Sequence, residues 1–156
     1  MDRRAQQPDD FASAFESAFA RLQVRLEMAC AEDAAWHRRV VVAVRGGLEL
    51  AAADPDDAST LTTAALAHGA DGLARYERLM AYLAGLLEGG RAESPHGADL
   101  PPTTERSIAG GVATIVANRV DRGRAAQLPG LHAELVQFIL TPYMGTEEAR
   151  RIAVAR

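Results

Sequence analysis

The chain has 156 residues, the length of one domain and enough to bury about 68–70% of the surface that the unfolded chain exposes. Hydrophobic residues make up 48% and charged residues 24%, so the composition is that of a folded protein. The single cysteine, Cys30, excludes an intramolecular disulfide and a zinc site of four cysteines, which fits a cytoplasmic location. The net charge is −4, whereas a compact DNA-binding domain usually has an excess of basic residues. No apolar run is long enough to span a membrane.

Helical periodicity recurs along the first part of the chain, and no segment alternates apolar and polar residues as a strand does. The spacing predicts helices over residues 9–31, 34–53, 55–67 and 71–88. One apolar stripe of the first helix consists of Phe11, Phe15, Phe19, Leu22 and Leu26. Gly46 and Gly47 interrupt the second helix and favour close packing of a neighbouring helix, with a widened pocket wall as the alternative.

The second part of the chain begins with a Pro/Gly-rich loop over residues 91–102, which we expect to be mobile because it has no apolar periodicity. Two further helices are expected over residues 103–121 and 129–140. Pro142 is expected to end or kink the second of these, because proline has no backbone N–H to donate.

The domain organisation that follows is simple. Residues 1–8 are expected to form a disordered or frayed N-terminus, residues 9–145 one all-α domain, and residues 146–156 a tail with at most a short frayed helix.

Four stretches then point to a known family by their order and spacing. They are Asp9-Asp10-Phe11 with Ala14-Phe15; Trp36-His37-Arg38-Arg39-Val40 with Leu48 and Leu50; Leu100-Pro101-Pro102-Thr103-Thr104-Glu105 with Gly110-Gly111-Val112; and Leu128-Pro129 with Leu131, Leu135, Phe138 and Pro142-Tyr143-Met144-Gly145. Together they resemble the C-terminal ligand-binding and dimerisation domain of the bacterial TetR family of transcriptional regulators. The resemblance implies a multi-helix bundle with orthogonal and antiparallel packing. The helix-turn-helix domain of such regulators is expected to be missing, so DNA would be contacted only through that missing segment.

The resemblance also implies a homodimer, in which the last two helices pair with their copies as a four-helix bundle. The expected interface residues are Gly110, Gly111, Ile115, Leu131, Leu135 and Phe138. The glycines would allow two long helices to approach closely. Packing of these helices within one chain is the alternative.

A small, largely hydrophobic effector is the ligand that the resemblance implies, in a pocket between the helices. Polar or soft side chains on otherwise apolar helices are the candidates to line it. They are Thr62, Tyr76, Met80, Thr114 and Asn118. Core filling is the alternative for Tyr76 and Met80, and a solvated or dimer-facing stripe is the alternative for Thr114 and Asn118.

Catalytic and metal-binding patterns do not stand out in the sequence. The four histidines are far apart, no two of them have helical i,i+3 or i,i+4 spacing, and there is no Gly-x-Ser-x-Gly elbow or phosphate-binding loop. We therefore expect no enzyme activity, metal or cofactor. The competing hypotheses are a stand-alone helical interaction protein that forms mixed dimers with full-length regulators, and a helical enzyme with an unrecognised site.

Overall fold

The fold of the protein is all-α, as the sequence predicts. The computed structural model describes residues 3–29 and 35–155, with side chains from residue 10 onward. The longer helices are α1 (Arg3–Ala29), α2 (Trp36–Ala53), α5 (Gly69–Leu87), α7 (Thr104–Asp121), α8 (His132–Met144) and α9 (Thr146–Val154). The shorter elements are α3 (Pro55–Ser59), the π-helical segment η1 (Thr60–Ala64), α4 (Ala65–Ala67), α6 (Gly90–Glu93) and the 3-10 segments η2 (Gly97–Asp99) and η3 (Ala125–Leu131).

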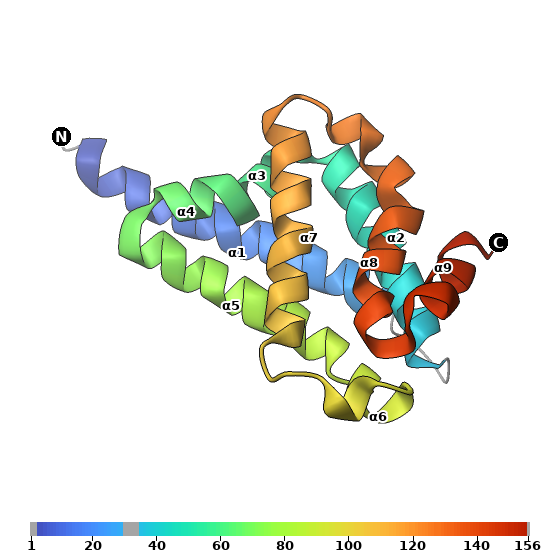
Figure 1. The fold of residues 1–156 in the computed structure, drawn as a ribbon. Helices are drawn as coiled ribbons and strands as arrows, with labels where there is room; N and C mark the ends of the chain where they lie inside the picture. Colours follow the sequence, from blue (N-terminus) through green and yellow to red (C-terminus); the bar gives the residue numbers. More distant parts are fainter. Residues whose placement is uncertain (1–2, 30–34, 156) are drawn as a thin grey trace.

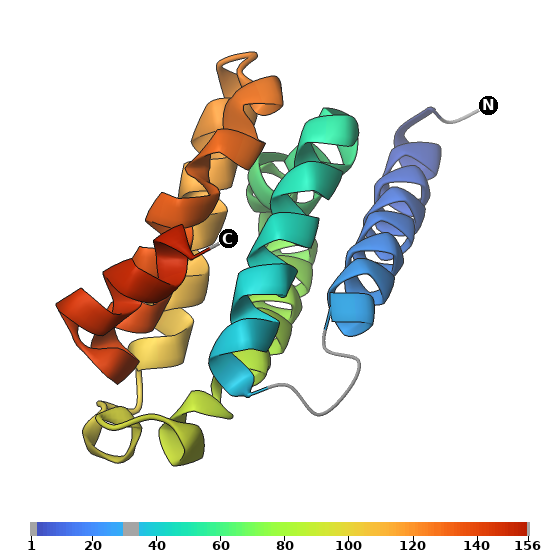
Figure 2. The same ribbon diagram turned by 90° about the vertical axis from the view of Figure 1, so that its right-hand side faces the viewer.

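The helices form a bundle in which α1 lies at one edge and α8 toward the opposite one (Figure 1, Figure 2). In Figure 1, α7 crosses in front of α1 and α5, while α2, α8 and α9 lie beside it. Figure 2 shows α1 at one edge, α2 in the middle and α7 with α8 toward the opposite edge. Among the described residues, no helix has the length and apolar content needed to cross a membrane.

The phenylalanine stripe fixes α1 against the bundle. Phe15 and Phe19 are buried and meet edge to face, with ring centroids 6.0 Å apart. The helix already begins at Arg3, upstream of the expected start at residue 9, so most of the stretch expected to be frayed is helical. Two expectations, the reduced thiol of Cys30 and a helix start after Asp33, fall outside the described residues.

The third predicted helix contains a feature that its sequence does not reveal. Asp54 caps its start by accepting a hydrogen bond from the Asp57 backbone N–H at 3.1 Å, and Pro55 takes the first turn. Beyond Ser59, the helix widens into the π-helical turn η1 before it closes as α4. Such turns are rare and occur frequently at functional sites.

The segment over residues 91–102, expected to be a mobile loop, is built from helical turns and tied down at several points. Arg91 donates hydrogen bonds to the carbonyls of Leu100 and Pro101 at 2.8 and 2.7 Å. At its start, Gly90 is packed so closely that an added Cβ would lie 2.6 Å from the Trp36 ring. Loop composition alone did not reveal these long-range contacts.

The C-terminal end also differs from expectation. Pro142 does not end α8, which continues to Met144 and stops at Gly145, where φ is +80°. Residues 146–154 are not a frayed tail but the packed helix α9, whose Ala149 and Ala153 are buried in the core. These small side chains let α9 lie directly on α8, and this contact stabilises a short helix that would be marginal alone.

Three separate clusters of buried side chains make up the core. The first joins α2, α5, α7, α8 and α9 around Trp36 and Tyr143, and the second joins α1, η1, α4, α5 and α7 around Phe15 and Met80. The third, around Leu48, joins α2, η3 and α8. A cavity lies where the three clusters meet.

Candidate ligand cavity

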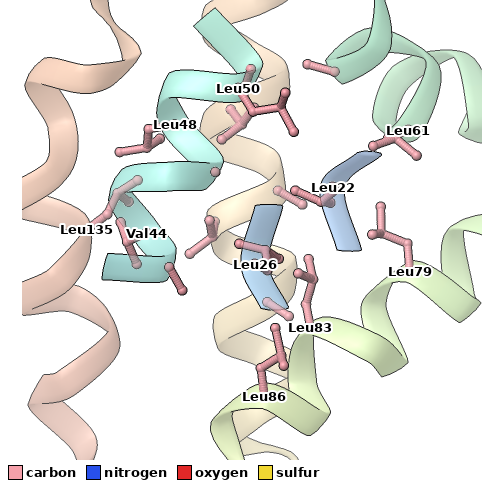
Figure 3. Close-up of a pocket in the computed structure, with 18 of the residues that line it drawn as sticks. Leu22, Leu26, Val44, Leu48, Leu50, Leu61, Leu79, Leu83, Leu86 and Leu135 are labelled. Atoms are coloured by element: carbon pink, nitrogen blue, oxygen red, sulfur yellow. The ribbon is translucent and has the colours of Figure 1, made fainter. Parts of the chain in front are cut away.

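The cavity has a volume of about 200 Å³, lies between helices from the whole bundle and is partly open to solvent. All three core clusters contribute to its wall: Trp36 and Ile108 belong to the first, Met80 to the second, and Leu48 and Leu135 to the third. Figure 3 shows side chains of α1, α2, η1, α5 and α8 around it. The ten labelled residues are Leu22, Leu26, Val44, Leu48, Leu50, Leu61, Leu79, Leu83, Leu86 and Leu135. Nearly all of the surface that they offer to a ligand is aliphatic.

Charged side chains line the cavity at three positions, and each already has a partner. Arg21 donates to both carboxylate oxygens of Asp57, at 2.6 and 2.7 Å. Asp54 accepts from a backbone N–H at the positive end of α3. Arg39 donates to the carboxylate of Glu93 at 3.2 Å. The wall therefore has no charge that requires an oppositely charged ligand.

Thr62 is the one lining residue with a hydroxyl group, and η1 brings it to the cavity. Its side chain is buried, and its Oγ1 donates to the Ala58 carbonyl at 2.7 Å. Ala58 lines the same cavity. The hydroxyl thus uses its proton within the wall and keeps its lone pairs as acceptors.

The predicted pocket residues divide into two groups. Thr62 and Met80 line the cavity, as predicted. Tyr76, Thr114 and Asn118 do not: Tyr76 packs beside the second core cluster, and the other two are exposed on α7. The hydroxyl of Thr114 donates back to the Gly110 carbonyl at 2.8 Å, so Thr114 belongs to the solvated or dimer-facing stripe and not to the pocket.

Sequence reasoning missed most of the wall. The lining leucines and valines look like ordinary core positions, because periodicity gives the inward face of each helix and not the space between faces. One signal was present: Gly47 lies in the wall, whereas an added Cβ at Gly46 would lie 3.2 Å from Arg25 of α1. The glycine pair therefore serves both of the roles considered, close helix packing and a pocket wall.

The residues predicted for the dimer interface differ in their exposure on the single chain. Phe138 is 43% exposed and lies over Gly111, where an added Cβ would be 3.1 Å from its ring. Gly110 faces open space, and Ile115 and Leu131 are half-buried against the third core cluster. Leu135 was wrongly placed at the interface: it is 1% exposed within one chain and lines the cavity.

A buried ionic cluster lies close to the cavity and holds α6, α7 and α8 together. Glu105 accepts from Arg91 at 2.8 Å and from the hydroxyl of Tyr143 at 3.1 Å. Burial alone would raise the pKa of the Glu105 carboxyl, but these hydrogen bonds outweigh it and hold the pKa below its ordinary value. Burial raises the pKa of Tyr143, so its hydroxyl stays protonated and donates.

This ionic cluster connects to the cavity through Trp36. The indole of Trp36 lines the cavity and packs against the Tyr143 ring, with centroids 4.6 Å apart. The Trp36 backbone N–H donates to Glu93 at 2.8 Å, and this bond lowers the pKa of that carboxyl. A ligand in the cavity would therefore contact the single tryptophan of the chain.

Comparison with known proteins gives no name for this arrangement. No family model, curated protein or solved structure matches the chain.

Within residues 3–29 and 35–155, no group of three or more His, Cys, Asp or Glu side chains could hold a metal ion. His68 stacks on Phe11, with ring centroids 3.8 Å apart, and a nitrogen of its ring lies 2.9 Å from the Ala64 carbonyl oxygen at the end of η1.

Proposed function

We propose that this chain is the core of a TetR-like transcriptional regulator, which binds a small, largely hydrophobic effector and forms a homodimer. The observation that carries the proposal is the apolar cavity between the helices, to which all three core clusters contribute. In this proposal the chain contacts DNA only through a helix-turn-helix segment outside it. Ligand binding would act by favouring the helix arrangement that holds the ligand best.

The size of the cavity supports a ligand-binding role. A closed apolar cavity costs stability at about 24 cal/mol per Å³, so roughly 5 kcal/mol is the upper limit of the cost of this partly open cavity relative to a filled core. Such a cost is comparable to the whole stability of many domains, about 5–15 kcal/mol. A cavity of roughly 150 Å³ lined by aliphatic residues already binds benzene in another protein, so this one is large enough for a somewhat bigger molecule.

A neutral apolar probe, octan-2-one, tests the cavity directly. We expect saturable binding, followed by the emission of Trp36, because the indole lines the cavity. Ala113→Leu fills part of the cavity and should weaken binding, whereas Ala117→Leu, one turn further along α7 and outside the wall, should not. Equal affinity for the two variants, or no saturable binding to the wild type, would contradict the proposed ligand site.

The dimer rests on the outer face of α7 and α8, defined by Gly110, Gly111, Thr114 and Phe138. Gly110 leaves the helix surface open, and the exposed aromatic side chain of Phe138 lies beside it over Gly111. A two-fold axis would place this face against its own copy. Light scattering should give twice the 16.6 kDa chain mass for the wild type and one chain mass for Phe138→Arg. Val24→Arg, which changes an exposed side chain on the distant helix α1, is the control.

The same exposed face supports the second candidate, a stand-alone interaction protein that forms mixed dimers with full-length regulators. That candidate needs the α7–α8 face and no ligand. It would be favoured if Phe138→Arg abolished pairing with a full-length regulator while octan-2-one did not bind in the cavity.

A further inference from the structure

We infer that the cavity selects an electrically neutral, aliphatic ligand with one hydrogen-bond donor, such as an alcohol, and that Thr62 is the residue that recognises the donor. This inference rests on the proposed ligand site and specifies its chemistry. It joins two observations: the charges of the wall are already paired, and the one lining hydroxyl is an unused acceptor on a π-helical turn.

The paired charges argue against an ionic ligand. Asp57 is bound by Arg21, Asp54 caps α3, and Arg39 contacts Glu93. A carboxylate ligand would find a cation in the wall only by displacing Glu93 from Arg39. An ammonium ligand would lose its hydration against an aliphatic wall whose two carboxylates, Asp54 and Asp57, already accept hydrogen bonds from the chain. Burying an unpaired charge is far more costly than burying a neutral polar group. Neutral ligands are therefore favoured over ions of the same chain length.

The geometry of Thr62 argues for a donor rather than an acceptor on the ligand. Its Oγ1 donates to the Ala58 carbonyl at 2.7 Å, so the hydroxyl proton is engaged. The remaining lone pairs can accept from a ligand O–H, whereas a ligand carbonyl would have to displace the bond to Ala58. Because Thr62 and Ala58 both line the cavity, this oxygen lies along the wall.

Thr62 and its neighbour Thr63 both lie in the π-helical turn η1 but face different surroundings. Thr62 is in the middle of η1, and the neighbouring Thr63 is directed elsewhere, with its hydroxyl donating to Asp121 at 2.9 Å on the exposed surface. Two threonines adjacent in sequence thus have different environments. The pair supplies a matched test, since each can be changed to the nearly isosteric valine.

The experiment compares four probes of similar chain length, 1-octanol, octan-2-one, octanoate and octylammonium, by calorimetry and Trp36 emission. For the wild type we expect 1-octanol to bind tightest and both ions to bind at least about tenfold more weakly than 1-octanol. One net hydrogen bond of about 1 kcal/mol corresponds to about fivefold in affinity. Thr62→Val should therefore reduce the ratio of 1-octanol to octan-2-one affinity by about fivefold. Thr62→Ser and Thr63→Val should preserve the ratio.

The outcomes separate this inference from the proposed function. If both neutral probes bind and Ala113→Leu weakens both, but Thr62→Val leaves their ratio unchanged, the cavity is a ligand site and the role of Thr62 is refuted. Tighter binding of octylammonium or octanoate would overturn the preference for neutral ligands. If no probe binds, the ligand site itself is refuted. Far-ultraviolet circular dichroism of each variant shows whether it folds. If Thr62→Val does not fold, Thr62→Ala removes the same hydroxyl and should reduce the ratio in the same way.

Discussion

Filling the cavity with Ala113→Leu should stabilise the protein, and the sign of the effect tests whether the cavity exists. Ala113 is a buried residue of α7 and lines the cavity. The substitution adds about three methylene equivalents, each worth about 0.8 kcal/mol when buried. Ordering the leucine side chain costs about 0.5–1 kcal/mol. The free energy of unfolding should therefore rise by about 1–2 kcal/mol.

A second alanine supplies the matched control. Ala149 of α9 is 0% exposed, packs in the first core cluster and does not line the cavity. Ala149→Leu has no space to enter and should lower the free energy of unfolding by about 1–3 kcal/mol, the usual cost of overpacking. The same change of residue type is thus expected to have opposite signs at the two positions.

Urea unfolding followed by far-ultraviolet circular dichroism measures both variants against the wild type. At about 2–4 °C per kcal/mol for chains of this size, Ala113→Leu should also raise the thermal midpoint by about 2–8 °C. A loss of stability at Ala113 equal to that at Ala149 would mean that the interior is filled at both positions. That result would refute the cavity and the ligand site built on it.

Four further substitutions test other parts of the structure. Glu105→Gln should lower the free energy of unfolding by about 2 kcal/mol at neutral pH, less than for a fully buried ion pair because its arginine partner is 30% exposed. The pKa of Glu105 in the folded protein lies below 4.5, so its contribution to the free energy of unfolding is present above that pH and is lost on acidification. The Glu105→Gln variant should therefore lose less stability than the wild type in acid titrations followed by circular dichroism. Gly90→Ala should destabilise by about 1–3 kcal/mol in urea unfolding, since its Cβ would clash with Trp36, whereas Gly85→Ala, in open space on α5, should stabilise by about 0.5–1 kcal/mol. Gly145→Ala should cost about 1–3 kcal/mol in thermal unfolding, because φ of +80° with ψ of 161° is a glycine conformation, and an unchanged midpoint would contradict it.

The sequence by itself determined the all-α class, the main helices and much of their inward faces. The phenylalanine stripe of α1, the Asp54-Pro55 start of α3 and the length of α7 all follow from local rules of periodicity and capping. These signals act over a few residues, so one sequence is enough to read them. Met80 was likewise found as an inward residue of α5.

Only the tertiary structure decided where space remains between those faces. Leu135 and Phe138 lie on the same helix and both look apolar, yet one lines the cavity and the other is exposed. Thr62 and Thr63 are neighbours in the chain, and the π-helical turn gives them different environments. A cavity is the volume left over when side chains from several helices meet. It depends on distances and crossing geometry across the whole bundle, which no periodicity within a single helix contains.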